Sequence, residues 1–174
     1  MGAKNKRPLY FISSEDFYFI AYSILLILEF LGGSQKKFKD HRKLAVLIQF
    51  ISDSRLVDIL SRTQNKAVVN HLDKEFLFSS FANAELYKRE VFKIIFCLER
   101  RGFIELQRTD VAETLEVKLN AENLPKGFFA GGEFDEERSN ADELKRLIPK
   151  ISILTFDTLI ARLYSDRGVR VWAS

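Results

Sequence analysis

The sequence feature that most constrains this chain is a change of hydrophobic period at Gly102. Before it, apolar residues recur at helical spacing along residues 84–101, which marks one core-facing stripe of a helix. After it, apolar and polar residues alternate in the runs 103–108 and 115–119, as they do in half-buried strands. Residues 109–114 join the two runs. The pattern predicts a helix that stops at a left-handed glycine and leads directly into a β-hairpin.

The remaining residues are mostly typical of helices. Residues 14–31 are the most apolar stretch, with Ser13 or Ser14 as the cap and glycines at the end. This stretch is shorter than the roughly 20 apolar residues that span a bilayer, so we interpret it as a central core helix. Further helices are predicted to be capped by Asp40, to start at Asp53 or Ser54, and to cover residues 68–72, with a loop after the last of these. Asn83 is the predicted cap of the helix over 84–101, and Ser139 is the predicted cap of a later helix. After Pro149, the sequence fits either a strand that leads into a helix or one helix entered at Thr155.

These elements predict a mainly α fold with a small β-hairpin, an α+β chain. We expect a winged-helix-like domain over residues 1–122, a flexible acidic and aromatic loop over 123–138, and a C-terminal helical extension over 139–174. A chain of 174 residues buries enough surface to fold without a disulfide or a metal. The single cysteine, Cys97, and the lack of a signal-peptide pattern favour a cytoplasmic protein that is not associated with a membrane.

A helix that runs into a hairpin suggests a winged helix, and in winged members of the helix-turn-helix class the helix before the wing enters the major groove of DNA. Phosphate contact requires local clusters of cations, because a net charge of +3 is too small by itself. The turn over 109–114 is acidic, so we expect non-specific contact with double-stranded DNA, or simply solvated basic faces. The candidate DNA-binding residues are Lys36, Lys37, Lys39, Arg42, Lys43, Arg100, Arg101 and Arg108.

Exposed aromatic residues suggest a second possibility, a surface that holds another protein. Phe92 and Phe96 are four residues apart and lie off the main apolar stripe of their helix. Either the C-terminal segment covers them, or they anchor a partner, since aromatic side chains often dominate the energy of interfaces. Phe128 and Phe129, in a glycine-rich loop, are candidates for the same role.

Catalytic patterns are weak in this sequence. There is neither a glycine-rich loop ending in Lys-Ser/Thr nor a G-x-S-x-G motif. Asp110, Glu116 and Lys118 loosely imitate a metal-dependent nuclease site, but an exposed face of an alternating strand produces the same spacing. We therefore predict a non-enzymatic protein with no catalytic residues, no metal and no cofactor.

Residues 4–119 contain the start "NKRPLY", the apolar helix ending in "LEFLGG", the segment through "LVDILSR", and "LYKREVFKIIFCLERRGFIEL" leading into the hairpin. This layout resembles the small middle components of bacterial three-component ABC systems, which are related to Lamassu-type antiviral defence operons. It excludes the acidic residues after Gly131. The resemblance implies an adaptor that caps an SMC-like ATPase head, while other subunits hydrolyse ATP and an effector, often a nuclease, cuts DNA.

Two functions follow from these observations. The first is an adaptor subunit that links an SMC-like ATPase to DNA, to an effector nuclease, or to both. The alternative is a free-standing winged-helix transcription regulator, expected to be a dimer. A regulator binds a short palindromic duplex by itself with a specificity ratio of roughly a thousand or more, whereas an adaptor binds DNA weakly and co-purifies with a large ATPase.

Overall fold

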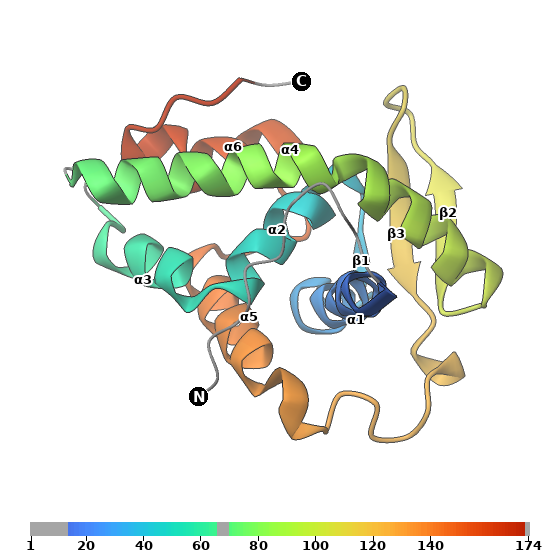
Figure 1. Cartoon of the computed structure of the whole chain (residues 1–174). Helices are drawn as coiled ribbons and strands as arrows, with labels where there is room; N and C mark the ends of the chain where they lie inside the picture. Colours follow the sequence, from blue (N-terminus) through green and yellow to red (C-terminus); the bar gives the residue numbers. More distant parts are fainter. Residues whose placement is uncertain (1–13, 66–69, 173–174) are drawn as a thin grey trace.

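The computed structural model describes residues 14–65 and 70–172 and has mainly helical structure with one small antiparallel sheet, which confirms the α+β expectation (Figure 1). The helices and strands are α1 (Ser14–Leu31), β1 (Lys37–Phe38), α2 (Arg42–Ser52), α3 (Ser54–Arg62), α4 (His71–Arg100), β2 (Ile104–Arg108), β3 (Leu115–Leu119), α5 (Asp135–Leu147) and α6 (Phe156–Leu163).

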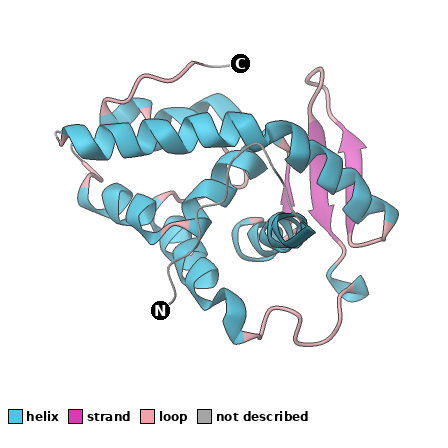
Figure 2. Cartoon of the chain, in the orientation of Figure 1, coloured by secondary structure: helices cyan, strands magenta, loops and turns pink. Residues whose placement is uncertain are grey.

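The predicted hairpin is confirmed as β2 and β3, and we call residues 104–119 the wing. The two strands pair in antiparallel register, with Ile104 opposite Leu119 and Arg108 opposite Leu115. Gly102 has a φ of +79°, the left-handed conformation expected where α4 stops. Figure 2 shows the sheet on one side of the helices.

A third strand, β1, pairs with β3 and completes a sheet of order β1-β3-β2. The sequence did not predict it, because two residues are too few to display a period. Within β1, Phe38 is fully buried while Lys37 is half-buried. The short strand thus ties the segment between α1 and α2 to the wing.

Helix α4 corrects two of the sequence-based predictions. Instead of a loop and a second helix capped by Asn83, one helix runs without interruption from His71 to Arg100. Of the short helix predicted over 68–72, residues 68 and 69 lie outside the described residues. Its cap is Asn70, whose side chain accepts hydrogen bonds from the backbone N–H groups of the first turn. The helix continues because Leu77, Phe81 and Ala84 extend the buried stripe toward the N-terminus at helical spacing. Two adjacent serines, Ser79 and Ser80, interrupt the apolar residues and obscured this stripe in the sequence.

Helix α1 is the centre of the core, as its apolar sequence predicted. Ile24, Leu26 and Leu28 are completely buried, and the helix contacts α2, α4, α5 and the wing strand β3 (Figure 1). Among the described residues, no helix has both the length and the apolar character to cross a bilayer.

The C-terminal segment contributes to the same core. Leu144 of α5 and Leu159 of α6 are fully buried within it. Asn140 donates a hydrogen bond across to the carbonyl of Ile51 at the end of α2, at 2.8 Å. Helices α5, α2 and α1 therefore form one packed unit.

The start of α5 differs from the predicted one, and the residues before α6 decide between the two predicted alternatives. Helix α5 begins at Asp135 rather than after Ser139, which lies inside it, because the acidic residues of its first turn favour the positive end of the helix dipole. Beyond Pro149, residues 150–154 form turns and not a strand. Thr155 caps α6, and its side chain accepts a hydrogen bond from the N–H of Thr158 at 3.1 Å.

Candidate docking groove

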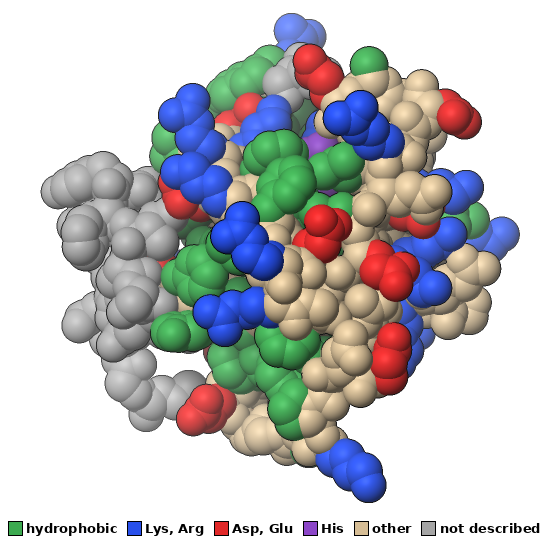
Figure 3. All heavy atoms as spheres, turned by 90° about the vertical axis from the view of Figure 1, so that its right-hand side faces the viewer, with side chains coloured by type: hydrophobic (Ala, Val, Ile, Leu, Met, Phe, Trp, Pro, Cys, Tyr) green, Lys and Arg blue, Asp and Glu red, His purple; other side chains and the backbone are tan. Residues whose placement is uncertain are grey.

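A groove of about 1170 Å³ lies between the wing, α4 and the start of α2. We call it the wing groove. Figure 3 views this side of the molecule and shows hydrophobic side chains gathered beside a His, with Lys and Arg side chains around them. The lining residues are His41, Arg42, Glu85, Lys88, Arg89, Phe92, Phe96, Arg108, Thr109, Val111, Ala112, Glu113, Thr114 and Leu115.

Helix α4 presents Phe92 and Phe96 to this groove. Because its buried stripe includes Val91 and Ile95, the positions one residue later face outward. Each of the two Phe side chains is 42% exposed, so the alternative that the C-terminal segment covers them is wrong. Their rings lie edge to face, with centroids 5.0 Å apart. The aromatic pair is thus partly open to solvent on the α4 side of the groove.

His41 connects the start of α2 with the wing at the bottom of the groove. Its imidazole Nδ1 accepts a hydrogen bond from the N–H of Leu115 at 3.1 Å, and its ring centroid lies 5.5 Å from that of Phe92. Burial lowers the pKa of His41, Asp40 opposes that shift, and the nearby cations Arg42 and Lys88 add to it. A neutral imidazole therefore holds the wing in place.

The cations that line the groove fall into two groups. Arg42 is held by Asp40 through several hydrogen bonds and lies over the Phe156 ring at 4.6 Å, and Lys88 lies 3.7 Å from Glu85. Arg89 on α4 and Arg108 on β2 are exposed, and neither forms an ion pair within residues 14–65 and 70–172. The last two are free to meet an anionic group.

The basic run "KKFKDHRK" does not form a track of free cations. Lys36 pairs with Glu29 at 2.9 Å, and Lys37 lies 3.4 Å from Glu116. Of the lysines in this run, Lys39 is exposed.

Lys43, from the same run, is buried with 1% of its surface exposed. Its ammonium donates to the carbonyl of Ser152 at 3.1 Å and lies over the Phe38 ring. Burial lowers the pKa of Lys43 to about 8. This position in the core cannot reach a phosphate.

The remaining predicted residues lie outside the groove. Arg100 and Arg101 are exposed at the C-terminal end of α4. Phe128 and Phe129 are half-buried against α1, where Phe128 stacks on Tyr22 with centroids 5.2 Å apart and Phe129 meets Phe30 edge to face. The groove therefore unites Arg42, Phe92, Phe96 and Arg108, and leaves the other candidates at separate places.

The residues that imitated a nuclease site are also placed. Asp110 lies at the exposed turn of the wing, whereas Glu116 and Lys118 are in β3, with Lys37 close to the Glu116 carboxylate. In the part of the chain that the structure describes, no three His, Cys, Asp or Glu side chains come close enough together to hold a metal ion.

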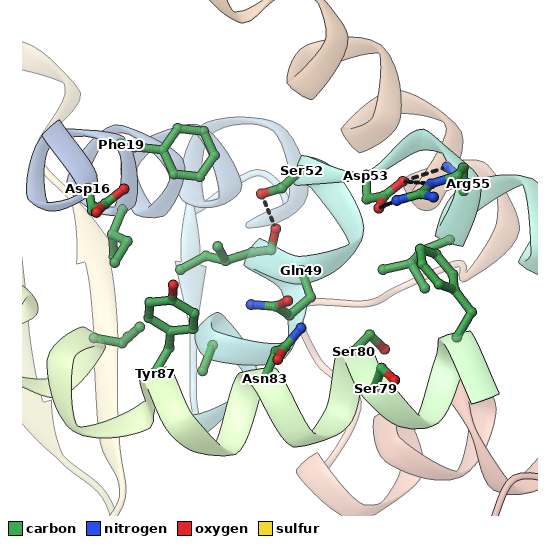
Figure 4. A pocket seen from close by; sticks show the side chains of 16 residues that line it. Asp16, Phe19, Gln49, Ser52, Asp53, Arg55, Ser79, Ser80, Asn83 and Tyr87 are labelled. Carbon is green, nitrogen blue, oxygen red and sulfur yellow. Dashed lines mark hydrogen bonds and ion pairs between the residues drawn. The ribbon is translucent and has the colours of Figure 1, made fainter. Parts of the chain in front are cut away.

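A second cavity of about 640 Å³ lies between α1, α2, α3 and α4 (Figure 4). The carboxamides of Gln49, on α2, and Asn83, on α4, point toward one another there, and neither makes a hydrogen bond to another described residue. Apolar side chains such as Ile48 and Val91 form much of its walls. None of the candidate residues from the sequence lines it.

Sequence reasoning missed several residues of the wing groove itself. His41 was an isolated histidine in the sequence, and its contact with Leu115 joins positions far apart along the chain. Val111, 61% exposed in the turn of the wing, carried no distinct signal either, because single apolar residues are common on protein surfaces.

Comparison of the chain with protein-family models, with curated proteins and with solved structures finds no match.

Proposed function

We propose that this protein is a non-enzymatic adaptor that docks a protein partner in the wing groove. The observation that supports the proposal is the exposed Phe92–Phe96 pair, which lines a groove together with apolar and cationic side chains. Exposed aromatic side chains in a concave setting are the residues on which binding energy concentrates. A monomer gains nothing in its own stability from leaving them uncovered.

The partner that we propose is an SMC-like ATPase of a bacterial defence complex, with an effector nuclease as a further subunit. The family resemblance of residues 4–119 suggests this partner. Weak, non-specific contact with double-stranded DNA is part of the proposal, and the exposed cations available for it are Lys39, Arg100, Arg101 and Arg108. The paired and buried cations Lys36, Lys37, Arg42 and Lys43 add little to such contact.

Co-expression with any SMC-like ATPase that the neighbouring genes encode tests the proposal. We expect one complex that survives size-exclusion chromatography, and Phe92→Asp is expected to prevent assembly while the variant alone keeps the melting temperature of the wild type. Leu86→Asp is the matched control, because Leu86 is 62% exposed on the same helix but does not line the groove.

Two outcomes would contradict the proposal. One is the absence of any complex with the ATPase. The other is a chain that alone binds a palindromic duplex roughly a thousandfold more tightly than a random duplex, which would favour the transcription regulator.

A further inference from the structure

We infer that the wing groove binds a peptide segment that carries a bulky apolar side chain flanked by carboxylates. The inference rests on the proposed function and specifies the chemistry of the docking segment. It follows from three features of the groove: apolar side chains in its lining, two cations without partners among the described residues, and a strand edge on which one backbone N–H is already bonded to a side chain.

The floor and walls suit an apolar side chain. Phe92 and Phe96 form the α4 side, and Val111, Ala112 and Leu115 of the wing face the same space. Because Val111 is 61% exposed and each Phe is 42% exposed, a bulky side chain inserted between them removes apolar surface from water on both walls. Such burial favours the complex, and the loss of translational and side-chain freedom on binding offsets part of the gain.

The charges select the residues that flank this anchor. Arg89 and Arg108 are the exposed lining cations that form no ion pair among the described residues. Glu113 is the one lining acid that forms no ion pair among them. This leaves an excess of positive charge on opposite walls, α4 and the wing. Carboxylates on either side of the anchor can each meet one Arg, and Arg binds carboxylates with two parallel hydrogen bonds.

A nucleic acid fits the groove less well than a peptide. The rings of Phe92 and Phe96 are inclined at 74° to one another, so they offer no flat surface for successive bases to stack on. Glu85 and Glu113 lie among the lining residues and repel phosphate. We therefore assign the groove to a protein segment, with nucleic-acid binding as an outcome that the test can reveal.

One hydrogen bond at the wing edge disfavours strand addition as a mode of peptide binding near this groove. The N–H of Leu106, on the edge strand β2, donates to the Glu99 carboxylate of α4 at 2.9 Å. A peptide that added itself as a further strand would have to displace this bond. The segment is therefore expected to bind through its side chains in the groove.

Selection from a phage-displayed library of random dodecapeptides on the full-length chain tests the inference. We expect enriched sequences with a Phe, Trp, Leu or Met anchor and Asp or Glu on both sides. Fluorescence anisotropy with the best synthetic peptide should show on the order of tenfold weaker binding to Phe92→Ala/Phe96→Ala and to Arg89→Glu/Arg108→Glu. Leu86→Ala and Lys126→Glu/Lys145→Glu, which alter exposed residues outside the groove, should bind as the wild type does.

Several results would overturn the inference: no enrichment over an empty support, enrichment of basic peptides, equal binding by the groove and control variants, or tighter binding of labelled oligothymidylate than of the best peptide. The selection uses the chain alone, so it separates the two proposals. Acidic peptides that bind in the groove without any ATPase complex would contradict only the proposed function. An ATPase complex that Phe92→Asp disrupts, together with a selection that enriches no acidic peptides, would contradict only this inference.

Discussion

His41 and Leu115 are joined by two hydrogen bonds, although 74 positions separate them in the sequence. The backbone N–H of His41 donates to the carbonyl of Leu115 at 2.9 Å, and the imidazole Nδ1 accepts from the N–H of Leu115 at 3.1 Å. This pair fixes the first residue of β3 to the start of α2. The shape of the wing groove thus depends on a titratable side chain.

The first prediction concerns acid. Burial lowers the pKa of folded His41 below the value of about 6.5 in an unfolded chain. The contribution of neutral His41 to the free energy of unfolding is therefore fully present above pH 6.5. As the pH falls below 6.5, His41 takes up a proton in the unfolded chain first. Its contribution to stability is then lost progressively until the pH has passed the lower pKa of the folded state. Urea denaturation should show that the free energy of unfolding of the wild type is lower at pH 5.5 than at pH 7.5, by an amount that His41→Ala does not lose.

At pH 7.5, His41→Ala should itself lower the free energy of unfolding by about 1 kcal/mol, because the N–H of Leu115 loses its side-chain acceptor. His71→Ala is the control, since His71 is an exposed residue at the start of α4. A pH dependence of His41→Ala equal to that of the wild type would show that His41 is not the titrating group.

The second prediction concerns Lys43 at alkaline pH. Its pKa is about 8 when folded and about 10.5 when unfolded, so the unfolded chain holds the proton more tightly. The contribution of neutral Lys43 to stability is therefore fully present above about pH 10.5 and is lost as the pH falls through 8. Between pH 8 and pH 10 the wild type should gain about 2 kcal/mol relative to Lys43→Met. Lys39→Met, which alters an exposed lysine, should keep the wild-type gain.

The third prediction concerns the turn between α1 and β1. A Cβ added at Gly32 would lie 2.3 Å from the carbonyl oxygen of Leu28 and 2.7 Å from the backbone nitrogen of Lys37. Neither backbone atom can move without disturbing α1 or β1, so Gly32→Ala should lower the free energy of unfolding by about 2 kcal/mol or more. Gly131→Ala is the control, because its Cβ meets no atom within 4 Å. Equal melting temperatures for the two variants would refute the close approach.

The fourth prediction separates Phe128 from the groove aromatics. Because Phe128 stacks on Tyr22 of α1, Phe128→Ala should lower stability by about 1–2 kcal/mol, as measured by chemical denaturation. The same variant should bind the selected peptide with wild-type affinity. Lys126→Ala, an exposed neighbour, should change neither quantity. Loss of peptide binding at unchanged stability would place Phe128 in the docking surface instead.

The fold could be read from the sequence wherever one period ran for several turns or residues. The switch at Gly102 predicted where α4 ends and which strands follow, and the apolar run of α1 predicted a central helix. Elements without such a period were missed or misplaced. Strand β1 has two residues, and polar residues around Ser80 obscured the continuity of α4.

The site was only partly predictable for a related reason. Phe92 and Phe96 departed from a clear stripe, and a departure from a pattern is visible in a sequence. The state of a charge is not, because it depends on neighbours that are distant along the chain. Lys43 and Arg42 belong to one basic run, yet Lys43 is buried against Ser152 and Arg42 lies over Phe156.

Site-specific photo-crosslinking tests the central claim most directly, namely that the wing groove is the surface that holds a protein partner. A photoreactive phenylalanine analogue would replace Phe96 in one variant and Leu86 in the other, and both would be irradiated in cells that also contain the SMC-like ATPase. We predict one discrete adduct between the chain and the ATPase from position 96 and none from position 86. Equal adducts from both positions, none from position 96, or adducts only with DNA would contradict the claim.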